Sequence, residues 1–282
     1  MFTGQIIAAI EAVAPLALQE PWDNSGLQVG TRAGECTGVL ICVDVTPAIV
    51  DEAIARGCNL IVSHHPLIFK GLKHLTGSTP VEAAVMNAIA AGITIYACHT
   101  PIDNVPGGVS YTMADMLGVH IQGALAPMDP ARLKALDDPT LQTVTDFGDP
   151  AYGLGVIGDY EERPTAQQLI ERVKKAFGSP VVRTNGLGVG DSENLIVRLA
   201  MCGGSGSEFI ATAVQKRCQA IITSDTRYHD FVDWANDILI IDIGHWESEQ
   251  CTRHIFKDII TKQYPGFNVL ISETETNPIK YL

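Results

Sequence analysis

Short apolar runs alternate with helix-forming stretches through the first hundred residues of the chain. Residues 38–44, 60–63 and 93–97 are short and almost wholly apolar, which is typical of strands buried on both faces of a sheet. Helices are expected between them, because residues 46–56 begin with a Thr-Pro cap and residues 80–91 are rich in alanine. This order of elements predicts a parallel α/β sheet.

The alternation is interrupted over residues 124–151, which contain four prolines and a charged stretch, and it resumes at residue 153. We interpret residues 124–151 as a linker or an excursion between domains. Further strands are expected near residues 195–201, 219–223, 238–243 and 267–271. Further helices are expected near residues 165–177, 206–217, 227–236 and 247–262. At roughly 150 residues per domain, the length of the chain predicts two α/β domains.

Composition places the chain among globular proteins and narrows the range of its partners. Hydrophobic residues make up 46% of the chain, enough for a sizeable core. The chain has 19 basic and 32 acidic residues and a formal net charge of −13, which disfavours binding to nucleic acids or to anionic membranes. No apolar run approaches the roughly 18–20 residues that a membrane-spanning helix needs.

Cysteine usage and the N-terminus indicate a cytoplasmic protein. The seven cysteines are odd in number and include no C-x-x-C pair, so we interpret them as reduced thiols. The first residues lack the basic region that opens a signal peptide.

Histidines and carboxylates follow three of the expected strands at the point where each strand ends. The three motifs are His64-His65-Pro66, His99-Thr100-Pro101-Ile102-Asp103 and His245-Trp246-Glu247-Ser248-Glu249. Parallel sheets bind ligands at the carboxyl ends of their strands, so we expect these side chains to face one site. A set of three histidines and two carboxylates from these motifs is too many for one closed tetrahedral ion, and it suits two ions with open water positions. The set consists of His64, His65, Asp103, His245 and Glu249.

Each of these residues also has an ordinary structural explanation when it is taken singly. The histidine pair could belong to a simple loop, and Asp103 could be a turn residue. His245 and Glu249 are four residues apart and could be a plain pair on one helix face. We take His99 as the candidate catalytic residue, for transfer of a proton, although a role as a ligand or as a partner of a ligand is equally open.

Three other segments carry weaker signals. The glycine-rich residues 202–208 could cradle an anion at a helix N-terminus, or could form only a tight turn from strand to helix. Asp225 is a candidate N-cap of the helix that follows it. Residues 24–26 have turn chemistry and predict an ordered loop.

Taken together, these segments resemble the NIF-three-like dinuclear metal-centre proteins, which are also labelled GTP cyclohydrolase 1 type 2 homologues. The matching segments run in order along nearly the whole chain, at residues 14–27, 63–66, 99–103, 202–207, 225–229 and 244–249. The chain departs from the family pattern at Pro101-Ile102, where Asn-Leu is more frequent, and at Trp246, where Tyr or His is more frequent. Neither departure removes a candidate ligand.

The resemblance implies a fold of two three-layer α/β domains, NIF-three-like in type. We expect the first domain to be discontinuous, formed by residues 1–124 and 238–282, because its site draws on motifs from both ends of the chain. Residues 125–237 would form the second domain. The resemblance also implies a toroidal homohexamer around interior metal sites.

The same resemblance implies two divalent metal ions per chain and a ligand set for each. His64, Asp103 and Glu249 would bind one ion. His65, His245 and Glu249 would bind the other, with Glu249 bridging the two. Mixed imidazole and carboxylate ligands suit Zn, Fe, Mn, Co or Ni.

The leading functional hypothesis is a metal-dependent hydrolase acting on a nucleotide-like or phosphoester small molecule, in which His99 moves a proton to the leaving group. The alternative is a non-catalytic protein, a metal-binding or scaffold ring. A regulator that binds a protein partner is a third class, and its DNA-binding form is disfavoured by the acidic charge.

Overall fold

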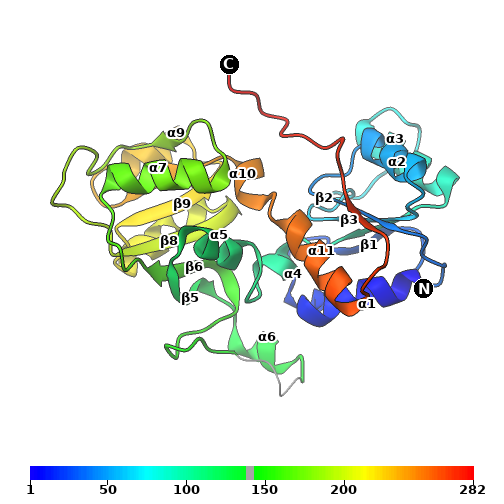
Figure 1. Cartoon of the computed structure of the whole chain (residues 1–282), viewed down its shortest axis with the longest axis horizontal. Helices are drawn as coiled ribbons and strands as arrows, with labels where there is room; N and C mark the ends of the chain where they lie inside the picture. The colour runs from blue at the N-terminus through cyan, green and yellow to red at the C-terminus, as the bar shows by residue number, and fades with distance from the viewer. Residues whose placement is uncertain (138–142) are drawn as a thin grey trace. The chain divides into compact units, whose positions relative to one another are not determined.

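The computed structural model of the protein describes residues 1–137 and 143–282, and the chain divides into two compact units. Unit 1 comprises residues 1–102 and 250–276, and unit 2 comprises residues 103–249 and 277–282. Each unit contains one β-sheet flanked by helices, so the expected α/β class is confirmed (Figure 1).

The boundaries of the units differ from the domain boundaries expected from the sequence. Residues 103–124 and 238–249, which we expected in the first domain, belong to unit 2. They carry β5 (His120–Pro127) and β10 (Leu239–Asp242), and both strands pair within the sheet of unit 2. The first unit of the structure and the expected first domain are both discontinuous in sequence.

Unit 1 has a five-stranded sheet in the order β1-β4-β3-β2-β11. Its strands are β1 (Gly26–Val29), β2 (Val39–Cys42), β3 (Leu60–Ser63), β4 (Thr94–Ala97) and β11 (Val269–Ile271). The four strands predicted from apolar runs are parallel, as expected. Strand β1 pairs antiparallel with β4 at the edge, and the sequence did not predict it.

Helices cover both faces of the sheet of unit 1. Helices α2 (Pro47–Ala55) and α3 (Pro80–Ala91) lie over one face, and α1 (Thr3–Val13) and α11 (Thr252–Gln263) lie over the other (Figure 1). Thr46 caps α2 as predicted, since its side chain accepts a hydrogen bond from the Ile49 amide. Successive residues of a strand point to opposite faces of the sheet, and helices cover both faces. The strand sequences are therefore apolar throughout.

Unit 2 has a six-stranded mixed sheet in the order β5-β6-β8-β9-β10-β7. The strands not yet given are β6 (Gly153–Asp159), β7 (Arg183–Thr184), β8 (Arg198–Ser205) and β9 (Ala220–Ser224). Strands β8, β9 and β10 pair in parallel, whereas β6 pairs antiparallel with both β5 and β8, and β7 pairs antiparallel with β10.

The helices of unit 2 are mostly short. They are α5 (Val109–Leu117), α6 (Pro130–Lys134), α7 (Ala166–Phe177), η2 (Ser207–Phe209), α8 (Ile210–Gln215), α9 (Tyr228–Asp233) and α10 (His245–Glu249). Helix α7 begins with the predicted capping box of Thr165 and Gln168. The single helix expected over 247–262 is wrong, because the chain forms α10 and then a separate α11.

The segment interpreted as a linker is partly regular. Strand β5 runs to Pro127, and α6 follows at Pro130. Residues 138–142 lie outside the described part of the chain. Among the residues that the structure describes, no helix combines the length and the apolar character needed to cross a membrane.

Candidate metal centre

Three histidines of unit 1 meet at one edge of its sheet. His64 and His65 follow β3, and His99 follows β4. The two strands are parallel neighbours with Ser63 opposite Ala97, so both end at the same edge. One ring nitrogen from each histidine lies within 4.8 Å of the others. We call His64, His65 and His99 the histidine cluster.

Two members of the cluster are oriented through hydrogen bonds at Nδ1. His64 Nδ1 lies 3.2 Å from the carbonyl oxygen of Cys98, and His65 Nδ1 lies 2.9 Å from Oδ1 of Asp44. Both partners are oxygen acceptors, so Nδ1 carries the proton and Nε2 keeps its lone pair. This tautomer is the one that presents Nε2 to a metal ion.

His99 is held in the same way by Asp23, a residue that sequence reasoning missed as part of the site. His99 Nδ1 lies 2.9 Å from Oδ1 of Asp23, whose side chain has no exposed surface. Oδ2 of Asp23 accepts hydrogen bonds from the hydroxyls of Ser25 (2.7 Å) and Thr100 (2.6 Å) and from the Thr100 amide (3.1 Å).

These contacts decide the charge of Asp23. Burial by itself would raise the pKa of the Asp23 carboxyl, but the hydrogen bonds from His99, Thr100 and Ser25 outweigh it and hold that pKa well below its ordinary value. The carboxylate is therefore ionised and well suited to fix the orientation of His99. Two short segments far apart in the sequence, residues 23–25 and 99–100, supply the whole arrangement.

A second group of candidate ligands lies in unit 2. His245 is the first residue of α10 and Glu249 is the last, and His245 Nε2 lies 2.9 Å from Oε2 of Glu249. The spacing of four residues on one helix face is the geometry that the sequence predicted. Asp103, the last residue of the short helix α4 (Thr100–Asp103), and Glu249 both raise the pKa of the buried Cys202 thiol beyond the effect of burial.

Asp225 orients His245, and this is a correction to its expected role. Helix α9 has Arg227 at its N-cap, whereas Asp225 has a left-handed backbone with φ of 55° and lies 2.7 Å from His245 Nδ1 through Oδ2. Burial lowers the pKa of His245, but the hydrogen bonds to Asp225 and Glu249 prevail and raise it to about 11 in the metal-free protein. The two carboxylates therefore stabilise positive charge on the His245 ring.

The glycine-rich residues 202–208 begin in the last part of β8 and pass beside Glu249. The amide of Gly204 donates to the Ser248 hydroxyl at 2.9 Å, and the amide of Gly203 donates to the Ser110 hydroxyl at 3.3 Å. A Cβ atom at Gly204, where φ is +62°, would overlap Oε1 of Glu249. Glycine is needed here because the backbone passes directly beside the carboxylate.

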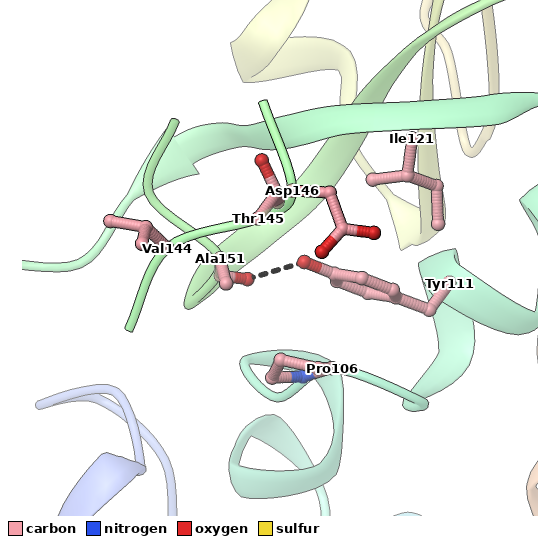
Figure 2. A pocket seen from close by; sticks show the side chains of 7 residues that line it. All are labelled: Pro106, Tyr111, Ile121, Val144, Thr145, Asp146 and Ala151. Carbon is pink, nitrogen blue, oxygen red and sulfur yellow. Dashed lines mark hydrogen bonds between the residues drawn. The ribbon is translucent and has the colours of Figure 1, made fainter. Parts of the chain in front are cut away.

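Unit 2 also contains a cavity of about 320 Å³ that involves none of the candidate ligands. Figure 2 shows its lining residues, among which the Tyr111 hydroxyl donates to the carbonyl oxygen of Ala151 at 2.7 Å and the Asp146 carboxylate points into the space. The candidate residues are thus found in two places: His64, His65 and His99 in unit 1, and Asp103, His245 and Glu249 in unit 2.

Comparison with known proteins gives one consistent result. A Lactococcus lactis protein named GTP cyclohydrolase 1 type 2 homolog is 33% identical over 272 residues, which cover 95% of each chain. A crystal structure of a Staphylococcus aureus protein has a TM-score of 0.83 and 28% identity, covering 100% of this chain and 99% of that one. The structure of a Bacillus cereus protein related to NIF3 has a TM-score of 0.85 at 23% identity, covering 100% and 99%.

The family comparison extends over almost every residue. The sequence model described as Duf34/NIF3 (NGG1p interacting factor 3) matches residues 1–278. The match includes the histidine cluster, Asp103, His245 and Glu249, and the fold agrees with that of the structural relatives. The chain therefore belongs to the DUF34/NIF3 family.

Proposed function

We propose that the chain is a metal-dependent hydrolase whose centre holds two divalent ions. The observation that carries the proposal is the way in which the candidate histidines are held: each binds an oxygen atom through Nδ1. Histidines that ligate metals commonly donate their other ring N–H to a carboxylate or a carbonyl in this way. Four histidines from three motifs share this arrangement, and a carboxylate is the Nδ1 partner of three of them.

The ligand assignment follows the family resemblance. We assign His64, Asp103 and Glu249 to one ion, and His65, His245 and Glu249 to the other. Imidazole nitrogens and carboxylate oxygens suit Zn, Fe, Mn, Co or Ni. The local charges fit this assignment, since Asp44 beside His65 and Asp225 beside His245 make these positions favourable for cations.

The chemistry divides between the ions and the side chains of the chain. Two bound ions would supply a nucleophilic water near neutral pH and stabilise the charge on the attacking and leaving oxygens. We propose His99 as the catalytic residue. Asp23 holds its Nδ1 proton in place, so that Nε2 is the atom that exchanges a proton with the leaving group.

The substrate class that we propose is a phosphoester or a nucleotide-like small molecule. The name carried by the Lactococcus lactis relative makes GTP a first compound to assay. We further propose a toroidal homohexamer, as the family resemblance implies, and a cytoplasmic location. The cysteines support a reducing compartment, because they are odd in number and include no C-x-x-C pair.

The test combines metal analysis with an activity screen. The purified protein should contain about two ions per chain and should hydrolyse at least one member of a panel of nucleotides and phosphoesters. His65→Ala and Glu249→Gln should lower the metal content and abolish the activity, because each removes a proposed ligand. His74→Ala, which changes an exposed histidine of unit 1, is the matched control and should leave both unchanged.

Two outcomes would contradict the proposal in different ways. Activity that survives the loss of both ligands would show that the hydrolysis does not use this centre. Stoichiometric metal with no turnover across the panel would favour the alternative function, a metal-binding or scaffold ring.

A further inference from the structure

Two exposed aromatic side chains lie next to each other on the surface of unit 1. Trp22 is 55% exposed and Phe69 is 46% exposed, although such side chains usually bury most of their area. Their ring centroids are 6.3 Å apart and the rings are tilted by 54°. We call these two residues the aromatic edge.

The aromatic edge is continuous with the histidine cluster. The ring centroid of His99 lies 5.7 Å from that of Trp22 and 6.4 Å from that of Phe69. Both aromatic rings stand edge-on to the imidazole. Along the chain, Trp22 directly precedes Asp23, which holds His99, so the aromatic edge and the catalytic candidate share one support.

Hydrogen bonds between two loops hold the aromatic edge in place. The side-chain amide of Asn24 donates to the carbonyl oxygen of Ile68 at 2.6 Å, and the amide of Ile68 donates to Oε1 of Gln28 at 3.2 Å. Nε2 of Gln28 donates back to the carbonyl oxygen of Asn24 at 2.7 Å. The loop that carries Trp22 is therefore fixed to the loop that carries Phe69, and a ligand would find both rings already positioned.

The sequence around Phe69 has a charge opposite to that of the whole chain. Residues 64–81 contain Lys70 and Lys73 and no acidic residue, whereas the chain as a whole has a net charge of −13. Lys70 and Lys73 are both exposed. This segment favours an anionic ligand, since local positive charge attracts phosphates.

We propose that the aromatic edge is a binding subsite for the planar heteroaromatic ring of a phosphorylated small molecule. Trp22 and Phe69 supply the stacking surface, and Lys70 and Lys73 favour the phosphate. The inference rests on the proposed function and narrows it: among phosphoesters, those that carry a planar ring are preferred. A flat ring at this place lies beside His99, where the proton transfer is proposed.

The test measures binding to the metal-loaded protein and needs no turnover. Adenosine 5′-monophosphate and ribose 5-phosphate are the probes, because they differ by the ring alone. Trp22→Ala and Phe69→Ala should each weaken binding of the first probe by roughly 5- to 100-fold, the range that one aromatic–base stack covers. Binding of ribose 5-phosphate should not change. Phe147→Ala, at a phenylalanine of unit 2 that is 60% exposed, is the matched control.

Each possible outcome bears on the proposal. It is overturned if the loaded protein binds both probes equally, if it binds neither, or if the variants keep their metal and their melting temperature but lose no affinity. It is also overturned if Trp22→Ala changes the number of chains in the assembly, because the aromatic edge would then be an interface between copies. The metal content of the same samples tests the proposed metal centre independently of the aromatic edge. If the protein binds the ring-bearing probe but hydrolyses no substrate, only the proposed hydrolase activity is contradicted.

Discussion

At the scale of single residues, the oxygen atom that each candidate histidine contacts through Nδ1 sets the orientation of its ring. Asp23 is 76 positions from His99, Asp44 is 21 from His65 and Asp225 is 20 from His245. All three carboxylates stand in turns or loops, where aspartate is common for reasons of backbone geometry alone. Residue type predicted the candidate ligands, but it gave no sign of these three partners.

Replacing Asp23 with asparagine should reverse the tautomer of His99. The amide group of Asp23→Asn can donate a hydrogen bond to Nδ1 of His99, so the ring proton is expected to move to Nε2. Nitrogen-15 NMR of the imidazole, recorded where the ring is neutral, measures this change directly. If the hydrolase proposal holds, turnover should fall by roughly 10²- to 10⁴-fold.

Asp44→Asn is the control for this experiment, because Asp44 contacts His65 and should alter that ring only. An unchanged His99 tautomer in Asp23→Asn would refute the positioning role of Asp23. Circular dichroism and thermal melting would separate this result from a failure to fold.

At the scale of elements, strand direction explains why the motifs converge. Strands β2, β3 and β4 are parallel, so Asp44, His65 and His99 emerge at one edge of the sheet. Strand β1 is antiparallel to β4, which brings the start of β1, and with it Asp23, to that same edge. The parallel strands followed from the apolar runs, whereas β1 contains a glycine and a glutamine among its four residues and is too polar to be predicted by pattern.

Helix α2 also anchors the chain that follows β11. Glu52 accepts hydrogen bonds from the Ser272 hydroxyl at 2.6 Å, from the Glu273 amide at 2.9 Å and from Arg56 at 2.8 Å. Burial by itself raises the pKa of Glu52, but these hydrogen bonds lower it to about 2. The ionised carboxylate therefore joins two elements that are far apart in the sequence.

This contact predicts a pH dependence of stability. Because the folded pKa of Glu52 lies below its ordinary value of 4.5, its contribution is complete above about pH 5 and is lost as the pH falls toward 2. Glu52→Gln should lower the free energy of unfolding by about 2–3 kcal/mol at pH 7. Urea unfolding at pH 7, 5 and 3 should show the difference between the two proteins shrinking with acidity, and a constant difference would contradict the assignment.

At the scale of the whole molecule, the candidate donors are divided between two units of similar architecture. Unit 1 provides only imidazoles, and unit 2 provides both carboxylates together with one imidazole. Both units belong to the region that the family model matches, because the match covers residues 1–278.

The proposed ring predicts the mass of the assembly. Native mass spectrometry of the metal-loaded protein should give six times the mass of one 30.3 kDa chain. Treatment with a chelator should remove about two ions per chain and lower the melting temperature, because ions that bind only the folded state stabilise it. A monomer or a dimer at micromolar concentration would exclude the hexamer, independently of the metal result.

The sequence by itself determined the α/β class, the parallel core of unit 1 and the identity of the candidate ligands. It could do so because buried strands appear as short apolar runs in the sequence. The chain also has only eight histidines, and four of them lie just after expected strands. Only the tertiary structure decided that β6 pairs antiparallel with β5 and β8 and that β7 pairs antiparallel with β10. It also decided that α10 and α11 are separate helices and which oxygen atom each histidine contacts. Those features depend on pairings between distant segments, and local periodicity carries no information about the distant partner.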